Sequence, residues 1–406
     1  MKLLHTSDWH LGQRLISKDR KNEHECFLKW ISDYISQNPI DALIIAGDIF
    51  DSCNPPNYAF ELYYNFLGSI FKTSPNTTVV VIGGNHDSPS SLEAPKQLLK
   101  LFNIHVTGGI SSNIEDDIIM VKSKNDELLG IICAVPYLRE RDIIAPVLGE
   151  SYEIKNEVLI DAIKKHYEEI KNKAIELKNS ISSKKIPMIA TGHLFTKGGS
   201  VSDGIRDIYV GSIGHIDSSI FPSEFDYLAL GHLHKPQKTG NNGKIRYSGS
   251  PIPLSFGESK TPKQIIKIDF DNDASTPNID KIDIPEFQKL KIIKGNFEEI
   301  ENELKSINKG DNIWIEVHAN INGRINELRS MIGEYEKQLD IEVLAIKNIN
   351  PQSSRLEGSD KIQTLHQITS IEVFKRKLDS YADFTDNEKN ELMDAYKEIV
   401  AEIENS

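Results

Sequence analysis

Five short segments of the sequence place potential metal ligands directly after apolar runs. They read SDWH (7–10), GDIFD (47–51), GNHD (84–87), GH (192–193) and GHLH (231–234). Their side chains supply carboxylates, imidazoles and one carboxamide, without a thiolate. Such a mixture of oxygen and nitrogen donors suits Mn²⁺, Fe or Zn²⁺ better than Ca²⁺, which prefers oxygen ligands alone.

The number of these donors indicates two ions. Seven or eight ligands are more than one ion with an open position can use, whereas two ions that share a bridging carboxylate would use them all. In such centres the ions lie ~3.5–4 Å apart and hold the attacking and leaving oxygens of a phosphoryl displacement. The donor set therefore predicts metal-assisted hydrolysis of a phosphate ester.

Each segment taken alone has an ordinary structural explanation. Asp8 and His10 could form an exposed turn, and Gly47 with Asp48 could form a turn at the end of a strand. The GHLH segment is a stronger signal, because alternate residues that leave a strand point the same way. The combination of all five segments, in this order along the chain, favours a metal centre over separate turns.

The elements that must position these donors are short, β-branched apolar runs, which we expect to be strands. The runs cover residues 2–6, 41–47, 78–84, 128–136, 186–192, 227–231 and 244–250. Apolar residues at helical spacing, such as Phe27 and Ile31, lie between the first runs, and a long charged helix is expected within 150–185. Strands that alternate with helices predict an α/β fold, whose ligands bind at the carboxyl ends of the strands. The closer spacing of the runs after residue 185 favours antiparallel pairing in the second half.

The chain has 406 residues, which exceeds one ordinary hydrophobic core. Residues 1–270 carry the alternating pattern and form the expected main domain. Residues 271–285 lose the apolar rhythm and contain two prolines, which predicts a linker. Residues 286–350 read as βαβαβ and predict a small second domain, and residues 351–406 predict amphipathic C-terminal helices.

Composition restricts the class of protein. The formal net charge of −13 disfavours a basic coat protein for nucleic acid, but an enzyme can cancel carboxylates with bound cations or rely on a basic partner. No apolar run approaches the ~20 residues of a membrane span, and the N-terminus does not resemble a signal peptide. Three widely separated cysteines indicate incidental thiols in a reducing compartment. We therefore expect a cytoplasmic protein.

The order of the motifs resembles that of the calcineurin-like metallophosphoesterases. The longer strings LHTSDWHLG, AGDIFD, GGNHDS, GHLF, YLALGHLHKPQ and YSGSPIPLSF are similar to those of the SbcD family of nuclease subunits. The likeness covers the first 260 residues by motif and the βαβαβ segment by position and pattern only. It implies a two-sheet α/β sandwich flanked by helices, followed by a small α+β capping domain and C-terminal helices.

The resemblance also implies a role for each polar residue of the motifs. The first ion would be held by Asp8, His10 and His234. The second ion would be held by Asn85, His193 and His232. The carboxylate of Asp48 would bridge the two ions.

His86 is not a ligand in the pattern that the resemblance implies. It would face the scissile phosphate, where it could stabilise charge or protonate the leaving oxygen. Asp51 resembles the partner that orients His86, and Asp87 is the alternative. Both carboxylates could instead brace the metal ligands.

The activity implied is Mn²⁺-dependent hydrolysis of DNA, as a 3′→5′ exonuclease on duplexes and an endonuclease on single strands and hairpins. The implied partner is SbcC, an ATPase of the SMC type, in DNA recombination, replication and repair. The chain has no P-loop motif, so ATP dependence would come from that partner. The capping domain would contact DNA, and the C-terminal helices would dock on the partner's coiled coil or else pack on their own domain.

The resemblance further implies a homodimer within a heterotetramer. Two alternatives share the same sequence features. A phosphoesterase for a small-molecule phosphodiester or a phosphoprotein could use the same core, and a non-catalytic scaffold could keep the fold. A complete ligand set argues against the scaffold.

Overall fold

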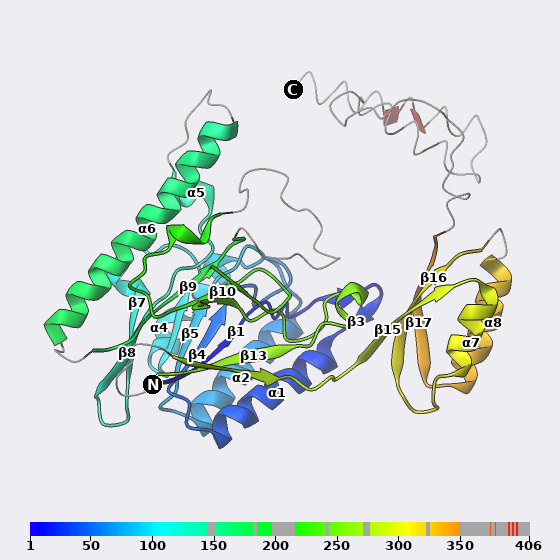
Figure 1. Cartoon of the computed structure of the whole chain (residues 1–406), viewed down its shortest axis with the longest axis horizontal. Helices are drawn as coiled ribbons and strands as arrows, with labels where there is room; N and C mark the ends of the chain where they lie inside the picture. Colours follow the sequence, from blue (N-terminus) through cyan, green and yellow to red (C-terminus); the bar gives the residue numbers. More distant parts are fainter. Residues whose placement is uncertain are drawn as a thin grey trace. The chain divides into compact units, whose positions relative to one another are not determined.

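The computed structural model describes residues 1–144, 152–181, 185–196, 216–240, 243–270, 277–321 and 325–349, with seven residues of the C-terminal segment. The chain divides into two compact units, Met1–Ile349 and Asn350–Ser406 (Figure 1). None of the helices in the described part combines the length and apolar character needed to cross a membrane.

The first sheet of the described residues has six strands. Four of them are adjacent to one another and run parallel. The parallel strands are β1 (Lys2–Thr6), β4 (Ala42–Ala46), β5 (Thr78–Ile82) and β6 (Ile104–Thr107). Two antiparallel strands, β13 (Gln264–Asp269) and β14 (Asn278–Asp283), extend the sheet beyond β1. Since β14 lies within residues 271–285, part of the expected linker belongs to this sheet.

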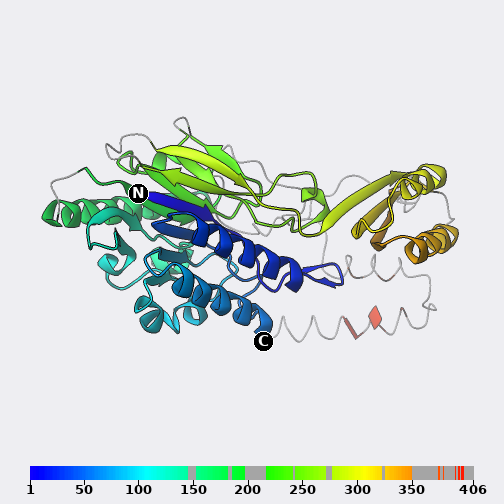
Figure 2. The same ribbon diagram turned by 90° about the horizontal axis from the view of Figure 1, so that it is seen from below.

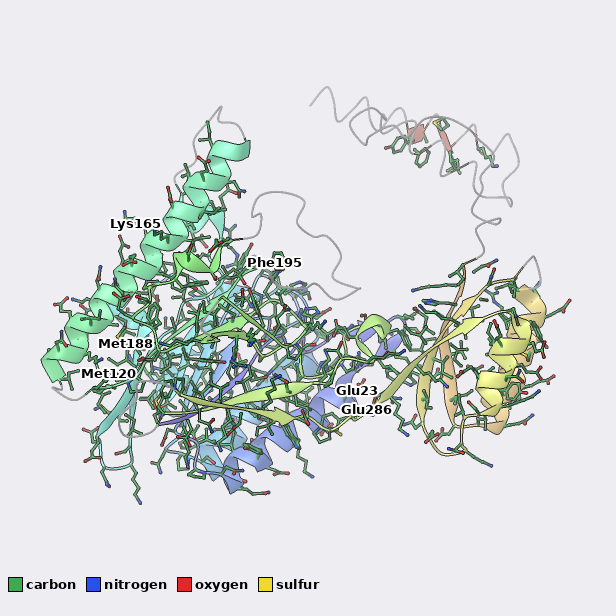
Figure 3. The ribbon with its side chains drawn as sticks, viewed as in Figure 1. Glu23, Met120, Lys165, Met188, Phe195 and Glu286 are labelled. Carbon is green, nitrogen blue, oxygen red and sulfur yellow. The ribbon has the colours of Figure 1, made fainter. Side chains whose placement is uncertain are left out.

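The second sheet, also six-stranded within the described ranges, has the order β11-β12-β10-β9-β8-β7. Its strands are β7 (Ile118–Lys122), β8 (Leu128–Cys133), β9 (Met188–His193), β10 (Tyr227–Gly231), β11 (Gln237–Thr239) and β12 (Ile245–Tyr247). Figure 3 labels Met120 of β7 and Met188 of β9. The expectation of antiparallel pairing is wrong for β9, β10 and β12, which run parallel. The hairpin of β11 with β12 turns the chain back, so that β12 runs in the direction of β10.

The two sheets pack face to face and helices cover their outer faces. Ile44 of β4 and Ile189 of β9 belong to one buried apolar cluster between the sheets. Leu43 and Ile45, the neighbours of Ile44, point the other way, into a second cluster under the helices. This outer layer consists of α1 (Lys21–Gln37) and α2 (Asn57–Thr73), which lie side by side (Figure 2). The α/β sandwich expected from the sequence is confirmed.

Helix α6 (Tyr152–Ile181) covers the outer face of the second sheet, where Tyr167 and Ile170 are fully buried. It is the long charged helix that the sequence predicts. Other short elements of this part include the hairpin β2 (Arg14–Leu15) with β3 (Lys18–Asp19), and the helices α3 (Pro89–Glu93), α4 (Lys96–Lys100) and α5 (Glu140–Ile143).

A smaller, three-stranded parallel sheet follows the first two. Its elements are β15 (Lys289–Gly295), α7 (Phe297–Lys305), β16 (Ile313–Ala319), α8 (Ile325–Gln338) and β17 (Ile341–Asn348), with β16 in the centre. This order of elements matches the βαβαβ pattern read from the sequence. Leu290 of β15 packs with Leu15 and Phe256, which belong to the preceding part of the chain.

Most of residues 351–406 lie outside the described residues. Phe374, Leu378, Leu392 and Tyr396 are among the described ones and are helical. The rings of Phe374 and Tyr396 stack with their centroids 4.0 Å apart.

Candidate metal centre

The five polar segments meet at one edge of the sandwich, because the strands that precede them end there. The backbone N–H of Asp8 donates to Gly47 O at 3.0 Å, which joins the ends of β1 and β4. The N–H of His232, after β10, donates to Asp8 Oδ1 at 2.8 Å and joins the two sheets. Donors that are up to 226 residues apart in the sequence, from Asp8 to His234, are thereby brought together.

The first donor set contains Asp8, His10 and His234, whose ligand atoms lie within 4.8 Å of one another. Asp8 and His10 are buried. His10 Nε2 has no hydrogen-bond partner among the residues described. A buried imidazole nitrogen without a hydrogen bond destabilises the fold. The position of this nitrogen therefore fits the role of a metal ligand.

The second donor set contains Asp48, His193 and His232, with ligand atoms again within 4.8 Å of one another. Asn85 completes it, because its Oδ1 lies 3.1 Å from both His193 Nε2 and His232 Nδ1. One oxygen and two ring nitrogens thus point to a common place beside the Asp48 carboxylate. Four donors of this kind suit a divalent transition-metal ion.

Asp48 lies between the two donor sets. Its Oδ2 is 3.2 Å from His193 Nε2 and 3.6 Å from His10 Nε2. Burial opposes ionisation, but the rings of His193 and His10 hold the pKa of the Asp48 carboxyl well below its usual range. A buried, ionised carboxylate between two sets of imidazoles has the placement that a bridging ligand needs.

Hydrogen bonds to Nδ1 orient two of these imidazoles. His193 Nδ1 lies 2.9 Å from Ala46 O, which can only accept, so that this nitrogen carries the proton. His234 Nδ1 lies 3.2 Å from Glu258 Oε1 in the same arrangement. In the neutral form of either ring, a proton on Nδ1 leaves the lone pair of Nε2 for a metal ion, as metal-binding histidines require.

His86 stands beside the first donor set and is half-buried. Its ring lies edge-on to His10, with centroids 4.9 Å apart, and its backbone N–H donates to Asp48 Oδ1 at 2.9 Å. Its Nδ1 donates to the backbone carbonyl of Asp51 at 2.8 Å. The Asp51 carboxylate instead lies 3.3 Å from His10 Nδ1. Asp51 thus meets His86 through its main chain and His10 through its side chain.

Asp87 is fully buried and holds two loops together. Its carboxylate accepts hydrogen bonds from the N–H groups of Ile49, Phe50 and Gly84 at 3.1, 2.9 and 2.8 Å. Burial raises the pKa of Asp87 to about 6, and the nearby charge of Asp48 acts in the same direction. The side chain braces the loops that carry Asp48 and His86, which is the second of the two roles that the sequence left open.

The backbone at four donors has an unusual conformation. Asp8, His10, Asp48 and His232 have φ angles of 53, 47, 50 and 101°. Residues other than glycine rarely adopt this left-handed region, at a cost of about 1–3 kcal/mol each. Trp9, between two of them, is fully buried against Phe27 and Phe66 and stabilises the loop. The surrounding packing therefore imposes the conformation that turns these side chains toward one another.

Three residues near the centre carry no signal in the sequence pattern. Tyr137 packs edge-on to the ring of His193, with centroids 6.3 Å apart. Arg139 lies over the Tyr137 ring and donates to Asp87 O at 2.9 Å. The third, Glu258, is buried behind His234. Burial opposes its charge, but His234 and Lys263 lower the pKa of Glu258 to about 2. None of the three lies directly after one of the strands whose ends supplied the donors.

Two family profiles match the chain. The profile of the calcineurin-like phosphoesterases matches residues 1–236. The SbcD C-terminal profile, described as the type 5 capsule protein repressor C-terminal domain, matches residues 286–381. The first match covers strands β1 to β10 and both donor sets, and the second covers the small parallel sheet.

Curated relatives agree with these profiles. In Escherichia coli, the SbcD subunit of the nuclease SbcCD is 33% identical over 382 residues, which are 93% of this chain and 92% of the relative. The Bacillus subtilis protein of the same name is 34% identical over 270 residues, 66% of each chain. The Staphylococcus epidermidis protein is 25% identical over 380 residues, 93% of each chain. The chain therefore belongs to the calcineurin-like phosphoesterases and, within them, to the SbcD family of nuclease subunits.

Proposed function

We propose that the chain hydrolyses DNA phosphodiester bonds at the two donor sets, as a 3′→5′ exonuclease on duplexes and an endonuclease on single strands and hairpins. The observation that carries this proposal is the position of Asp48, 3.2 Å from a ligand of one set and 3.6 Å from a ligand of the other, with His86 alongside. The near full-length likeness to nuclease subunits supports DNA as the substrate over a small phosphodiester.

The proposed roles follow the two donor sets. Asp8, His10 and His234 would hold one ion, Asn85, His193 and His232 would hold the other, and Asp48 would serve both. When bound, two divalent cations would lower the pKa of the attacking water and neutralise the charge that develops on the phosphate. We propose Mn²⁺ as the natural ion, because the likeness to SbcD nuclease subunits implies it and the mixed nitrogen and oxygen donors are compatible with it.

The chain's own contribution to the chemistry centres on His86. With Nδ1 bonded to the Asp51 carbonyl, His86 keeps Nε2 available for the substrate. As the bond from phosphorus to the leaving oxygen breaks, a proton held on Nε2 can pass to that oxygen. We propose His86 as the catalytic residue and Asp51 as the residue that orients it.

A nuclease assay tests the proposal directly. Purified chain in Mn²⁺ is expected to release nucleotides from the 3′ ends of labelled duplex DNA and to open hairpin DNA, and EDTA is expected to stop both reactions. Hydrolysis of bis-p-nitrophenyl phosphate without any cleavage of DNA, with or without an SMC-type partner, would favour the small-molecule alternative. Binding of fewer than two Mn²⁺ ions per chain would favour the alternative that the chain is a non-catalytic scaffold.

The likeness to SbcD proteins also supports an assembly. We propose an SbcC-type SMC ATPase as the partner, with the C-terminal helices docking on its coiled coil and the small parallel sheet contacting DNA. We propose the cytoplasm as the location of this complex, because its proposed substrate is DNA.

We propose that a second copy of the chain covers an apolar patch formed by α2, α4 and the residue that follows α4. Phe71, Leu98 and Leu101 are 43, 57 and 78% exposed, and the Phe71 ring packs on Phe102 with centroids 4.5 Å apart. A two-fold interface is self-complementary, so a single patch of this kind is enough to form a homodimer.

Light scattering is expected to give about twice the chain mass of 45.8 kDa for the wild type. Leu101→Glu should give the monomer mass, because it places a charge in the apolar patch. The matched variant Ile181→Glu, at an exposed apolar residue on α6, should remain a dimer. A monomeric wild type at micromolar concentration would exclude the homodimer.

A further inference from the structure

His234 is held at two points by a buried ion pair. Glu258 ends the short 3₁₀ helix η3 (Phe256–Glu258) and is only 1% exposed. Its Oε1 lies 3.2 Å from His234 Nδ1, and its Oε2 lies 2.6 Å from Lys263 Nζ. The carboxylate therefore links a donor of the first set to a buried ammonium group.

Lys263 reaches the main chain of the same histidine. Its Nζ donates to His234 O at 3.3 Å and to Ser250 Oγ at 2.8 Å. The N–H of Ser250 donates to His234 O as well, at 3.2 Å. The ring of His234 is thus fixed by Glu258 and its carbonyl by Lys263 and Ser250.

A buried ion pair contributes little net free energy to the stability of a fold. Removal of two charges from water costs several kcal/mol per ion, and well-packed apolar residues of similar size often serve equally well. The location of this pair, in contact with a residue of the first donor set, offers another reason for its presence. A carboxylate on Nδ1 fixes the tautomer and the plane of an imidazole and makes Nε2 a better ligand.

We propose that Glu258 is a positioning residue that sets the orientation and the metal affinity of His234, with Lys263 holding the carboxylate in place. This inference rests on the proposed metal centre, in which His234 is a ligand. Loss of such a partner typically weakens metal binding by about 10- to 100-fold. The effect should fall on one of the two ions, because the imidazole that Glu258 orients belongs to the first donor set alone.

Two double variants separate positioning from simple charge balance. Glu258→Met/Lys263→Met replaces the pair by apolar side chains of similar length, so no charge is left buried alone. Glu258→Gln/Lys263→Met is equally neutral but keeps an oxygen that can accept from His234 Nδ1–H. The two proteins differ only at the group that faces the imidazole.

Mn²⁺ binding is measured by electron paramagnetic resonance titration and calorimetry, and folding is followed by thermal unfolding. The Met/Met variant is expected to bind one ion about 10- to 100-fold more weakly and the other normally, while the Gln/Met variant recovers most of the affinity. The control is Glu23→Gln, which weakens the buried Arg20–Glu23 ion pair near the start of α1 (Figure 3). It should lower thermal stability and leave both affinities unchanged.

Equal affinities for the wild type and the Met/Met variant would overturn the inference, as would equal weakening in both double variants. A wild-type chain that binds fewer than two ions would instead overturn the proposed metal centre. The two failures are therefore distinguishable in one set of titrations.

Discussion

Asp48→Asn is expected to lower kcat/KM for DNA hydrolysis by at least about a thousandfold and to reduce the number of tightly bound Mn²⁺ ions from two to one. The carboxylate is the only proposed ligand shared by both donor sets, at 3.2 Å from His193 and 3.6 Å from His10. A neutral amide cannot offset the charge of two adjacent cations. Loss of one ion removes several kcal/mol of transition-state stabilisation, and each 1.36 kcal/mol is about tenfold in rate.

The matched control is Asp41→Asn. Asp41 lies directly before β4, whereas Asp48 follows the other end of the same strand. Asp41 accepts a hydrogen bond from the N–H of Lys2 at 2.6 Å, so this variant should lose some stability and keep its activity. Rates are measured on labelled duplex DNA, and bound metal is measured by elemental analysis. An Asp48→Asn protein that binds two ions with normal affinity and cleaves DNA at the wild-type rate would rule out the bridging role.

His86→Ala should have the second-largest effect, a loss of about 10²–10⁴-fold in kcat with both ions still bound. His86 contributes to neither complete donor set, and its Nδ1 is already engaged by the Asp51 carbonyl. Its loss therefore removes proton transfer or charge stabilisation and leaves the metal ligands in place. Single-turnover cleavage and a parallel Mn²⁺ titration measure the two quantities separately.

A different outcome has a definite structural meaning. His10, Asp51 and His86 also place ligand atoms within 4.8 Å of one another. If His86→Ala loses an ion, this third group binds metal and His86 is a ligand. His166→Ala, on α6 and outside all three groups, serves as the histidine control. Asp51→Ala should cost less than His86→Ala, since the carbonyl that holds His86 remains.

The candidate donors could be grouped from the sequence because they follow strands. Asp8, Asp48 and His232 follow within two residues of short, buried strands that stand out in the sequence as apolar runs. Parallel strands bring their carboxyl ends to one edge, so knowledge of the strands was enough to group the side chains. Helix α1 likewise covers the stretch whose apolar spacing, at Phe27 and Ile31, predicted a helix.

Other features depend on contacts that no local pattern reveals. Glu258 lies 24 residues after His234, on a short 3₁₀ helix, and only the folded chain brings them together. The partner of His86 Nδ1 is a backbone carbonyl, which every residue possesses, so the sequence drew attention to the Asp51 side chain instead. Strand β14 lies at an edge of the sheet and has only Ile279 and Ile282 as apolar residues, so its polar composition resembled a linker.

The left-handed backbone at Asp8, His10, Asp48 and His232 makes catalysis and resistance to heat compete for the same residues. Glycine or asparagine would relieve the conformation at these positions and stabilise the fold, but would remove a charged or imidazole donor. A library of variants selected for thermal stability alone should therefore accumulate substitutions at the metal centre and lose activity. Selection for cleavage would keep the strained residues and require compensating stability from the apolar layers around them.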